Sequence, residues 1–292
     1  MRGTPDVGMT LRRRFRSAIT ALVWTVGSRL PHGGRVVVCA VGSRLLGLVP
    51  LRGVRQWEDN VEVALGRRPT RAERRVLLAS WLRNNLMSLS LARWSDDDVL
   101  SRVIIDDEDL ERLRQSLAGP GVVLVLPHMG SWDFAGAWCA RVGIKVVSVA
   151  ERLPRGVYER FRDARAGMGM DILPVGQDNL MRVLADAVRE GQAVCLLSDR
   201  DLSGRGLTVP WPGTGSTVNV PAGPALLARV TGCDLRVVTT AFRGDRVAVF
   251  VGDVVAAGSP ATMMADVVAG FAEAVHRDPT SWLMLQPFFR DA

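Results

Sequence analysis

A histidine and a carboxylate five residues apart are the side chains best suited to chemistry in this sequence. His128 follows an apolar, β-branched stretch, 122–126, that ends at Pro127, and Asp133 lies at the start of the next apolar segment. A histidine at the carboxyl end of a buried strand is a candidate general base, and a carboxylate nearby can orient its ring. The pair indicates a reaction in which a hydroxyl group loses a proton.

The spacing of this pair limits where each residue can lie. On an ideal helix a step of five residues puts two side chains about 140° apart, on different faces. His128 and Asp133 can therefore meet only if His128 lies in the turn before a helix and Asp133 in the first turns of that helix. Pro127 at the strand end and Gly130 in the turn permit this arrangement.

Charged side chains follow two further predicted strands. They are Glu151, Arg152, Asp199, Arg200 and Asp201, at the ends of the stretches 145–150 and 193–198. Because parallel strands of one sheet present their carboxyl ends at the same edge, we expect these residues to converge with His128. Arg165, in the helix after Glu151, is expected to face the same cleft. The alternative is that these charges follow strands only because loops are solvated.

Alternating strands and helices predict an α/β fold for these residues. Strands are expected at 122–126, 145–150, 171–174 and 193–198, and helices at 131–141, 158–168 and 179–190. A strand pair at 235–241 and 246–251, with a turn at Gly244-Asp245, and a helix at 260–275 follow. The pattern predicts a mixed, mostly parallel central sheet flanked by helices on both faces.

The N-terminal part of the chain is predicted to be helical. Residues 11–50 are apolar and helical in pattern, 106–117 is a short helix, and 67–94 is a helix that begins with a capping box, Thr70 to Glu73. The apolar runs at 18–26 and 36–49 are too short or interrupted for a spanning helix of about 20 residues. No cleavage signature of a secretory signal follows them.

Arginines flank these apolar runs. Arg12, Arg13, Arg14 and Arg16 precede the first run. The pattern favours helices that lie in a membrane interface, with arginines at the headgroups and Leu22, Trp24 and Leu46 below them. The alternative is a pair of ordinary helices packed on the core. We therefore divide the chain into a helical membrane-associating region, 1–56, and a main domain, 57–292, packed as one structural unit.

Composition favours an anionic partner. The 292 residues carry a net charge of +7, and Lys145 is the only lysine, so arginine supplies nearly all of the positive charge. Arginine binds phosphate through a planar fork. Four cysteines lie far apart without metal-ligand spacing, which predicts small buried apolar residues in a reducing compartment and no metal site. No phosphate-binding glycine loop or nucleophilic serine elbow is present in the sequence.

Six of the eight tryptophans lie in segments that could line an apolar pocket. They are Trp81, Trp94, Trp132, Trp138, Trp211 and Trp282. Each is also an ordinary core residue by its context.

The segment Leu-Pro-His-Met-Gly-Ser-Trp-Asp, 126–133, resembles the H-x4-D motif of the lipid A biosynthesis acyltransferases. More narrowly, it is similar to the motif of the actinobacterial phosphatidylinositol mannoside acyltransferases. The resemblance continues through 149–153, 173–174, 195–202 and 284–287, and it covers most of the chain.

The resemblance implies a glycerolipid-acyltransferase-like α/β fold with N-terminal helices against the membrane. It implies transfer of a fatty acyl group, typically palmitoyl, from acyl-CoA to a mannose hydroxyl of a phosphatidylinositol mannoside. The site would be the cytoplasmic face of the plasma membrane, reached as a peripheral protein. We expect a monomer that uses acyl-CoA as co-substrate and needs no cofactor.

The resemblance also assigns roles to single residues. His128 matches the base and Asp133 the motif acid, while Glu151 and Arg165 match acceptor-binding positions. Asp199 stands where the mannoside enzymes usually carry glutamate. We expect Arg152, Arg200 and Asp201 to bind substrate as well.

The expected mechanism is direct acyl transfer without an acyl-enzyme. His128 accepts the proton of the attacking hydroxyl, and either Asp133 or Asp199 orients the imidazole. A nearby alternative is an acyltransferase for another glycolipid acceptor, such as a lipid A precursor. A remote alternative is an arginine-rich protein that binds nucleic acid, although the sequence contains no recognisable module for it and Tyr158 is the only tyrosine.

Overall fold

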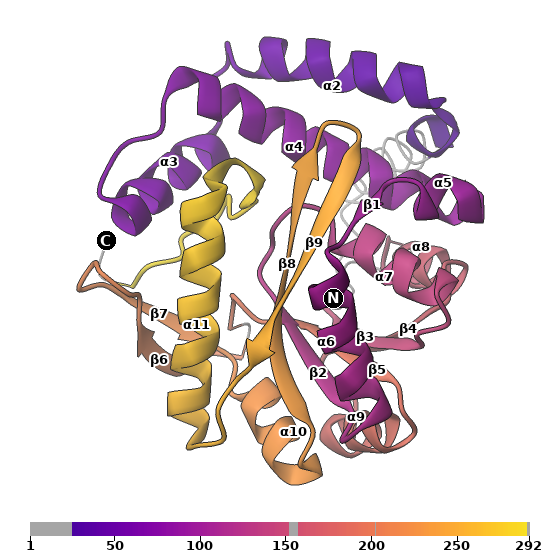
Figure 1. Ribbon diagram of the computed structural model, residues 1–292. Coiled ribbons are helices and arrows are strands. Elements are labelled where there is room, and N and C mark those ends of the chain that lie inside the picture. The colour runs from indigo at the N-terminus through magenta and orange to yellow at the C-terminus, as the bar shows by residue number, and fades with distance from the viewer. Residues whose placement is uncertain (1–24, 152–156, 202, 291–292) are drawn as a thin grey trace, which may run out of the picture.

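Seven strands form the central sheet of the computed structural model, which describes residues 25–151, 157–201 and 203–290 (Figure 1). The order across the sheet is β1-β9-β8-β2-β5-β3-β4. The strands are β1 Val103–Ile104, β2 Val122–Leu126, β3 Val146–Ala150, β4 Met170–Pro174, β5 Ala193–Leu197, β8 Asp234–Arg243 and β9 Arg246–Val254. Strands β8, β2, β5, β3 and β4 run parallel, and β9 is antiparallel to β8. The predicted mixed, mostly parallel sheet is confirmed.

Helices cover both faces of this sheet. They are α2 His32–Leu46, α3 Arg52–Leu65, α4 Arg71–Ser90, α5 Asp96–Leu100, α6 Asp107–Ala118, α7 Trp132–Arg141, α8 Val157–Ala166, α9 Leu180–Arg189, α10 Gly223–Thr231 and α11 Pro260–Arg277. Buried side chains of α6 and α7 belong to one core cluster, and those of α3, α9, α10 and α11 to the other. Figure 1 shows α2 and α4 lying across one end of the sheet.

Strand β2 is apolar throughout because both of its faces are covered. All five residues are buried, with Val123 and Val125 in one core and Leu124 and Leu126 in the other. It also has a hydrogen-bonded neighbour on each side, β5 and β8. A strand enclosed in this way fixes the position of whatever follows it, here Pro127 and His128.

The sheet opens between β3 and β5. These strands pair only from Val146 to Ser148, whereas β3 pairs with β4 as far as Ala150, and β2 pairs with β5 as far as Leu197. The carboxyl-terminal residues of β3 and β5 are therefore not hydrogen-bonded to one another. The opening lies at the same edge of the sheet as His128.

Several elements were not anticipated from the sequence. The short elements β1 and α5, the antiparallel hairpin of β6 Leu207–Pro210 and β7 Thr217–Val220, and helix α10 lie in stretches to which no structure was assigned. Helix α3 was also missed, and it crosses the expected boundary between residues 56 and 57. Its Trp57 and Val61 are fully buried in the core. The division into 1–56 and 57–292 thus falls within a helix that packs on the main domain.

The N-terminal region is described only in part. The arginine run and the residues Leu22 and Trp24 lie outside the described residues, while 25–29 are helical and α2 packs on α4. The outer side of α2 exposes apolar side chains, which include Val36, Val37, Val41 and Leu45. Within the described ranges, no helix has the length and apolar character needed to cross a membrane.

The predicted capping box at the start of α4 is confirmed, and it makes stability depend on pH. Glu73 accepts hydrogen bonds from the Thr70 amide (2.7 Å) and from the Arg67 guanidinium (2.7 Å). The hydrogen bond from Arg67 is the main cause that lowers the pKa of Glu73 from 4.5 to about 2, against the opposing effect of burial. Because the folded-state pKa is depressed, the contribution is complete above about pH 4.5 and is lost as the pH falls towards 2.

We expect Glu73→Ala to lower the free energy of unfolding by about 1 kcal/mol at pH 7, since the capping box loses the side chain that binds the Thr70 amide. The difference from the unmodified protein should shrink between pH 4.5 and pH 3. Urea denaturation at these pH values measures it. An equal difference at pH 7 and pH 3 would contradict the assignment.

Candidate active site

Two neighbouring strands bring His128 and Asp199 together. His128 follows β2, Asp199 follows β5, and their strands pair directly. The carboxylate of Asp199 accepts a hydrogen bond from the His128 backbone amide (2.7 Å) and contacts the imidazole Nδ1 (2.6 Å). Asp199 is only 1% exposed. Because a carboxylate only accepts hydrogen bonds, Nδ1 carries a proton, and Nε2 is the nitrogen left to accept one from a substrate.

The turn after His128 is fixed by the conformation of Gly130 and by hydrogen bonds to Thr240. Gly130 adopts a φ of +60°, and a Cβ atom there would clash with the carbonyl oxygen of Thr240. The Thr240 hydroxyl donates to the Met129 carbonyl (2.7 Å) and accepts from the Ser131 amide (2.8 Å). A glycine is therefore required at position 130, both for the backbone conformation and for this close approach.

The C-terminal segment holds the same turn from the other side. The Leu283 amide donates to the His128 carbonyl (2.8 Å), and the Gly130 amide donates to the Ser281 carbonyl (2.8 Å). Met129 and Trp282 form an isolated antiparallel bridge. Thr240, Ser281 and Leu283 were not identified from the sequence, because residues more than 100 positions away carry no local signal of this contact.

Asp133 does not pair with His128, contrary to the first expectation. It lies in the first turn of α7, as predicted, but its carboxylate faces α8. There it accepts hydrogen bonds from Arg165 Nε (2.8 Å) and Nη2 (3.3 Å). The position opposite the His128 ring is taken by Asp199, because the strand order makes β5 the neighbour of β2. Of the two carboxylates considered for orienting the imidazole, Asp199 is the one in contact with it.

The Asp133–Arg165 ion pair is buried. The side chains are 4% and 18% exposed. Burial by itself lowers the pKa of Arg165, but the negative charge and hydrogen bonds of Asp133 outweigh it and raise the pKa above the ordinary value. Arg165 therefore stays charged, and the pair ties the start of α7 to the end of α8 beside His128.

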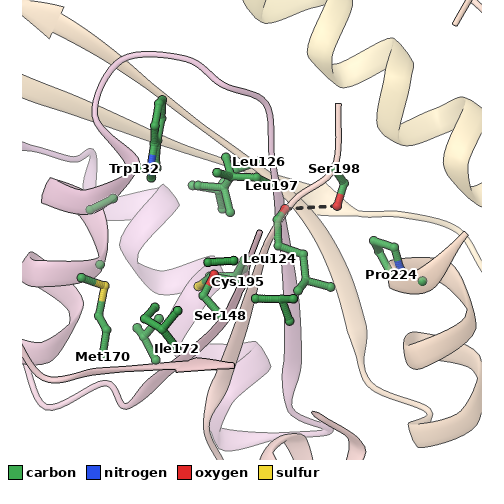
Figure 2. Close-up of a pocket in the computed structure, with 18 of the residues that line it drawn as sticks. Leu124, Leu126, Trp132, Ser148, Met170, Ile172, Cys195, Leu197, Ser198 and Pro224 are labelled. Carbon is green, nitrogen blue, oxygen red and sulfur yellow. Dashed lines mark hydrogen bonds between the residues drawn. The ribbon is translucent and has the colours of Figure 1, made fainter. Parts of the chain in front are cut away.

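A largely apolar cavity of about 670 Å³ opens next to His128. Figure 2 shows the lining side chains, among them Leu124, Leu126, Met170 and Ile172. These four lie on the α7 side of the sheet, whereas Leu184 and Leu196 from the opposite core also line the cavity. The cavity therefore extends through the opening between β3 and β5.

The structure brings most of the charged residues expected at this edge of the sheet to one cavity. The cavity lining includes His128, Asp133, Glu151, Arg165, Arg200 and Asp201. Asp199 lies behind the imidazole and supports it. Arg152 lies outside the described residues.

Asp201 has a structural task within this group. Its carboxylate accepts hydrogen bonds from Ser203, from the Gly206 amide (2.7 Å) and from Asn219 Nδ2 (3.1 Å). Burial raises the pKa of Asp201, but hydrogen bonds, above all those from Ser203 and the Gly206 amide, lower the pKa by more, so the net change is downward. The carboxylate organises the loop that leads into the β6–β7 hairpin, which leaves Arg200 as the more available side chain.

The tryptophans and cysteines divide between core and cavity. Trp132 and Trp138 line the cavity, whereas Trp211 and Trp282 stack in the core with ring centroids 6.0 Å apart. The ring of Trp132 also meets that of His128 edge to face, at a centroid distance of 5.3 Å. Cys139 lines the cavity as well, and burial raises the pKa of its thiol to about 12, as expected of an apolar lining.

We expect Arg165→Ala to lower the free energy of unfolding by about 3 kcal/mol, because it leaves the buried Asp133 carboxylate without its partner. Adding Asp133→Asn should recover part of this loss. Chemical denaturation of the single and double variants tests the coupling. Arg162→Ala on the same helix, whose ion pair with Asp163 is exposed, is the matched control and should change nothing measurable. If the two substitutions, at positions 133 and 165, changed the free energy of unfolding additively, the two side chains would not interact and the proposed coupling would be refuted.

Curated proteins named phosphatidylinositol mannoside acyltransferase resemble this chain. The protein from Mycolicibacterium smegmatis is 35% identical over 189 residues, which are 63% of this chain and 62% of that protein. The protein from Mycobacterium tuberculosis is 36% identical over 184 residues, 61% of this chain and 58% of that protein. The matched stretches thus cover less than two thirds of either relative.

A wider match covers nearly the whole sequence. The sequence pattern of the bacterial lipid A biosynthesis acyltransferases matches residues 9–291. This range contains the strand β2, the turn with His128, the ion pair of α7 with α8, and the C-terminal segment that holds the turn. The chain belongs to the bacterial lipid A biosynthesis acyltransferase family.

Proposed function

We propose that this protein is an acyltransferase that moves a fatty acyl group from acyl-CoA to a mannose hydroxyl of a phosphatidylinositol mannoside. The observation that carries the proposal is the imidazole of His128, oriented by a buried carboxylate, at the wall of an apolar cavity. Family membership supports acyl transfer, and the names of the two relatives support the acceptor.

The proposed reaction is a direct transfer with His128 as general base. Nε2 takes the proton of the mannose hydroxyl while the hydroxyl oxygen attacks the thioester carbonyl carbon. The tetrahedral intermediate collapses, the carbon–sulfur bond breaks, and the imidazolium returns the proton to the leaving thiolate. The products are the ester and free CoA. Asp199 stabilises the imidazolium and keeps the other nitrogen protonated.

The cavity is proposed to hold the acyl chain. Its volume of about 670 Å³ lies within the range of about 300–1,000 Å³ of ligand pockets, and its lining is mostly aliphatic. A palmitoyl chain would enter beside His128 and extend through the opening between β3 and β5. The thioester carbonyl would then remain at the edge of the sheet, where the base lies.

The charged rim is proposed to bind the polar parts of the substrates. Arg200 and Arg165 line the cavity next to His128, and Arg152 directly follows Glu151 in the sequence. Guanidinium groups suit the phosphates of coenzyme A and of the inositol headgroup. Glu151 is proposed to accept hydrogen bonds from sugar hydroxyls. No cofactor or metal takes part in this scheme.

The N-terminal region is proposed to hold the protein on the membrane that contains its acceptor. The exposed apolar side of α2, with Val37, Val41 and Leu45, would lie among the lipids, and flanking arginines would contact anionic headgroups. We place the protein, as a peripheral monomer, on the cytoplasmic face of the plasma membrane, where acyl-CoA is made.

Another glycolipid acceptor is the second candidate. The description of the family, lipid A biosynthesis, favours it. Purified protein supplied with palmitoyl-CoA and either a phosphatidylinositol mannoside or a lipid A precursor distinguishes the two, with mass spectrometry of the acylated product. If only the lipid A precursor is acylated, the proposed acceptor is wrong and a lipid A precursor takes its place.

We expect His128→Ala to lower kcat/KM by about 10²–10⁴-fold, because the reaction loses its general base. Asp199→Asn should lower it by a smaller factor, since the imidazole remains but loses its orienting charge. Release of free CoA from palmitoyl-CoA in the presence of acceptor measures both. His276→Ala, on α11, is the control and should retain full activity. Near-normal transfer by His128→Ala would refute the proposed mechanism.

We expect Ser148→Leu to shift the preference towards shorter acyl chains. Ser148 lines the cavity on β3 at its last pair with β5, and Figure 2 shows it beside Cys195 among the lining residues. The larger side chain should raise the ratio of kcat/KM for octanoyl-CoA over palmitoyl-CoA by about tenfold. Ser148→Ala, which adds no volume, is the matched control. An unchanged ratio would show that the chain binds elsewhere.

A further inference from the structure

An acyl transfer needs a group that stabilises the negative charge on the carbonyl oxygen, and the turn after His128 has no free amide for it. The amides of His128, Met129, Gly130 and Ser131 donate to Asp199, to the Pro127 carbonyl, to the Ser281 carbonyl and to the Thr240 hydroxyl. These are the backbone groups closest in sequence to the proposed base. All four are engaged within the chain.

The next residue supplies a different donor. The indole Nε1 of Trp132 is buried, and no hydrogen-bond partner for it is found among the described residues. Trp132 lines the cavity, and Figure 2 shows its ring at the border of the group of lining side chains. A buried donor without a partner is costly, and such a group at a cavity wall is suited to bind a ligand atom.

The ring that carries this donor lies directly beside the proposed base. The rings of Trp132 and His128 meet edge to face with their centroids 5.3 Å apart, so both groups border the same small volume. A hydroxyl that is deprotonated by His128 attacks a carbonyl carbon in this volume. The carbonyl oxygen then needs a donor at about 2.7–3.1 Å, within reach of a ring that borders the same space.

We propose that the indole N–H of Trp132 donates a hydrogen bond to the thioester carbonyl oxygen and stabilises the oxyanion of the tetrahedral intermediate. As the hydroxyl oxygen bonds to the carbonyl carbon, the electron pair of the C=O bond moves to its oxygen, which accepts the hydrogen bond. The pair returns when the carbon–sulfur bond breaks and the thiolate leaves. The indole proton stays on its nitrogen throughout. This inference rests on the proposed acyl transfer.

Arg165 and Arg200 are the cationic donors among the residues that line this cavity. Arg165 donates through Nε and Nη2 to Asp133, and those two groups are therefore engaged. Arg200 lines the cavity and is the main competitor for the same task. Its proposed partner is a phosphate, so its loss should affect substrate binding more than turnover.

The test is Trp132→Phe, which keeps an aromatic ring against His128 and removes only the N–H donor and part of the ring. We expect kcat with palmitoyl-CoA to fall about 10²-fold with little change in KM, because the lost hydrogen bond is much stronger to the charged oxygen of the transition state than to the neutral carbonyl. The pH profile of kcat/KM should keep its shape, since the base is untouched. A changed profile would instead make Trp132 a residue that positions His128.

Two matched controls separate chemistry from packing. Trp211→Phe removes another buried N–H without a partner, in the core beside Trp282, and should leave kcat unchanged. Trp138→Phe alters the same cavity at a residue for which no ring contact with His128 is found in the described part of the chain, and should change the KM for acyl-CoA more than kcat. Circular dichroism and thermal unfolding check that all three variants fold.

The outcomes distinguish this inference from the proposed function. Normal kcat in Trp132→Phe, with His128→Ala inactive, would overturn the role of the indole alone. If Arg200→Ala then lost kcat, the oxyanion donor would be Arg200. Absence of acyl transfer by the unmodified protein, or normal transfer by His128→Ala, would overturn the proposed function itself.

Discussion

The contact between the imidazole of His128 and the buried carboxylate of Asp199 is the interaction around which the site is arranged. Asp199 binds both the ring and the backbone amide of the same residue, so one carboxylate fixes the tautomer, the ring orientation and the start of the turn. Asp199 is only 1% exposed, and a carboxylate buried to this extent needs such hydrogen-bond partners. The pairing of β2 with β5 supplies this constraint, and every other group in the site is positioned relative to it.

Two consequences follow from the same sheet. The turn after His128 is held by Thr240 on β8 and by the C-terminal segment, so its amides are used to build the turn. The short pairing of β3 with β5 leaves an opening beside the base, and apolar side chains from both cores line it. The turn on one side of His128 is rigid, and the space on the other side is open and apolar. This arrangement suits a base that acts on a hydroxyl group next to a bound apolar chain.

Sequence patterns predicted the elements with strong local signals. The buried strands β2, β3 and β5, the capping box at Thr70 and the helix starting beside Asp133 all lie where composition and spacing indicated. Two of the elements that were missed differ in the strength of their local signal. Helix α3 has a clear one, because its buried residues Val54, Trp57 and Val61 recur at steps of three and four, and it was overlooked. The β6–β7 hairpin is short and contains proline, glycine and threonine, so long-range packing defines it.

The sequence by itself determined the chemical groups and the edge of the sheet at which they meet, because strands that alternate with helices run parallel and share a carboxyl edge. It placed His128, Asp133 and Asp199 there without deciding how they pair. Only the tertiary structure decided that, because pairing depends on the order of strands across the sheet. That order sets Asp199 against His128 and leaves Asp133 to Arg165, two contacts between residues that lie 71 and 32 positions apart.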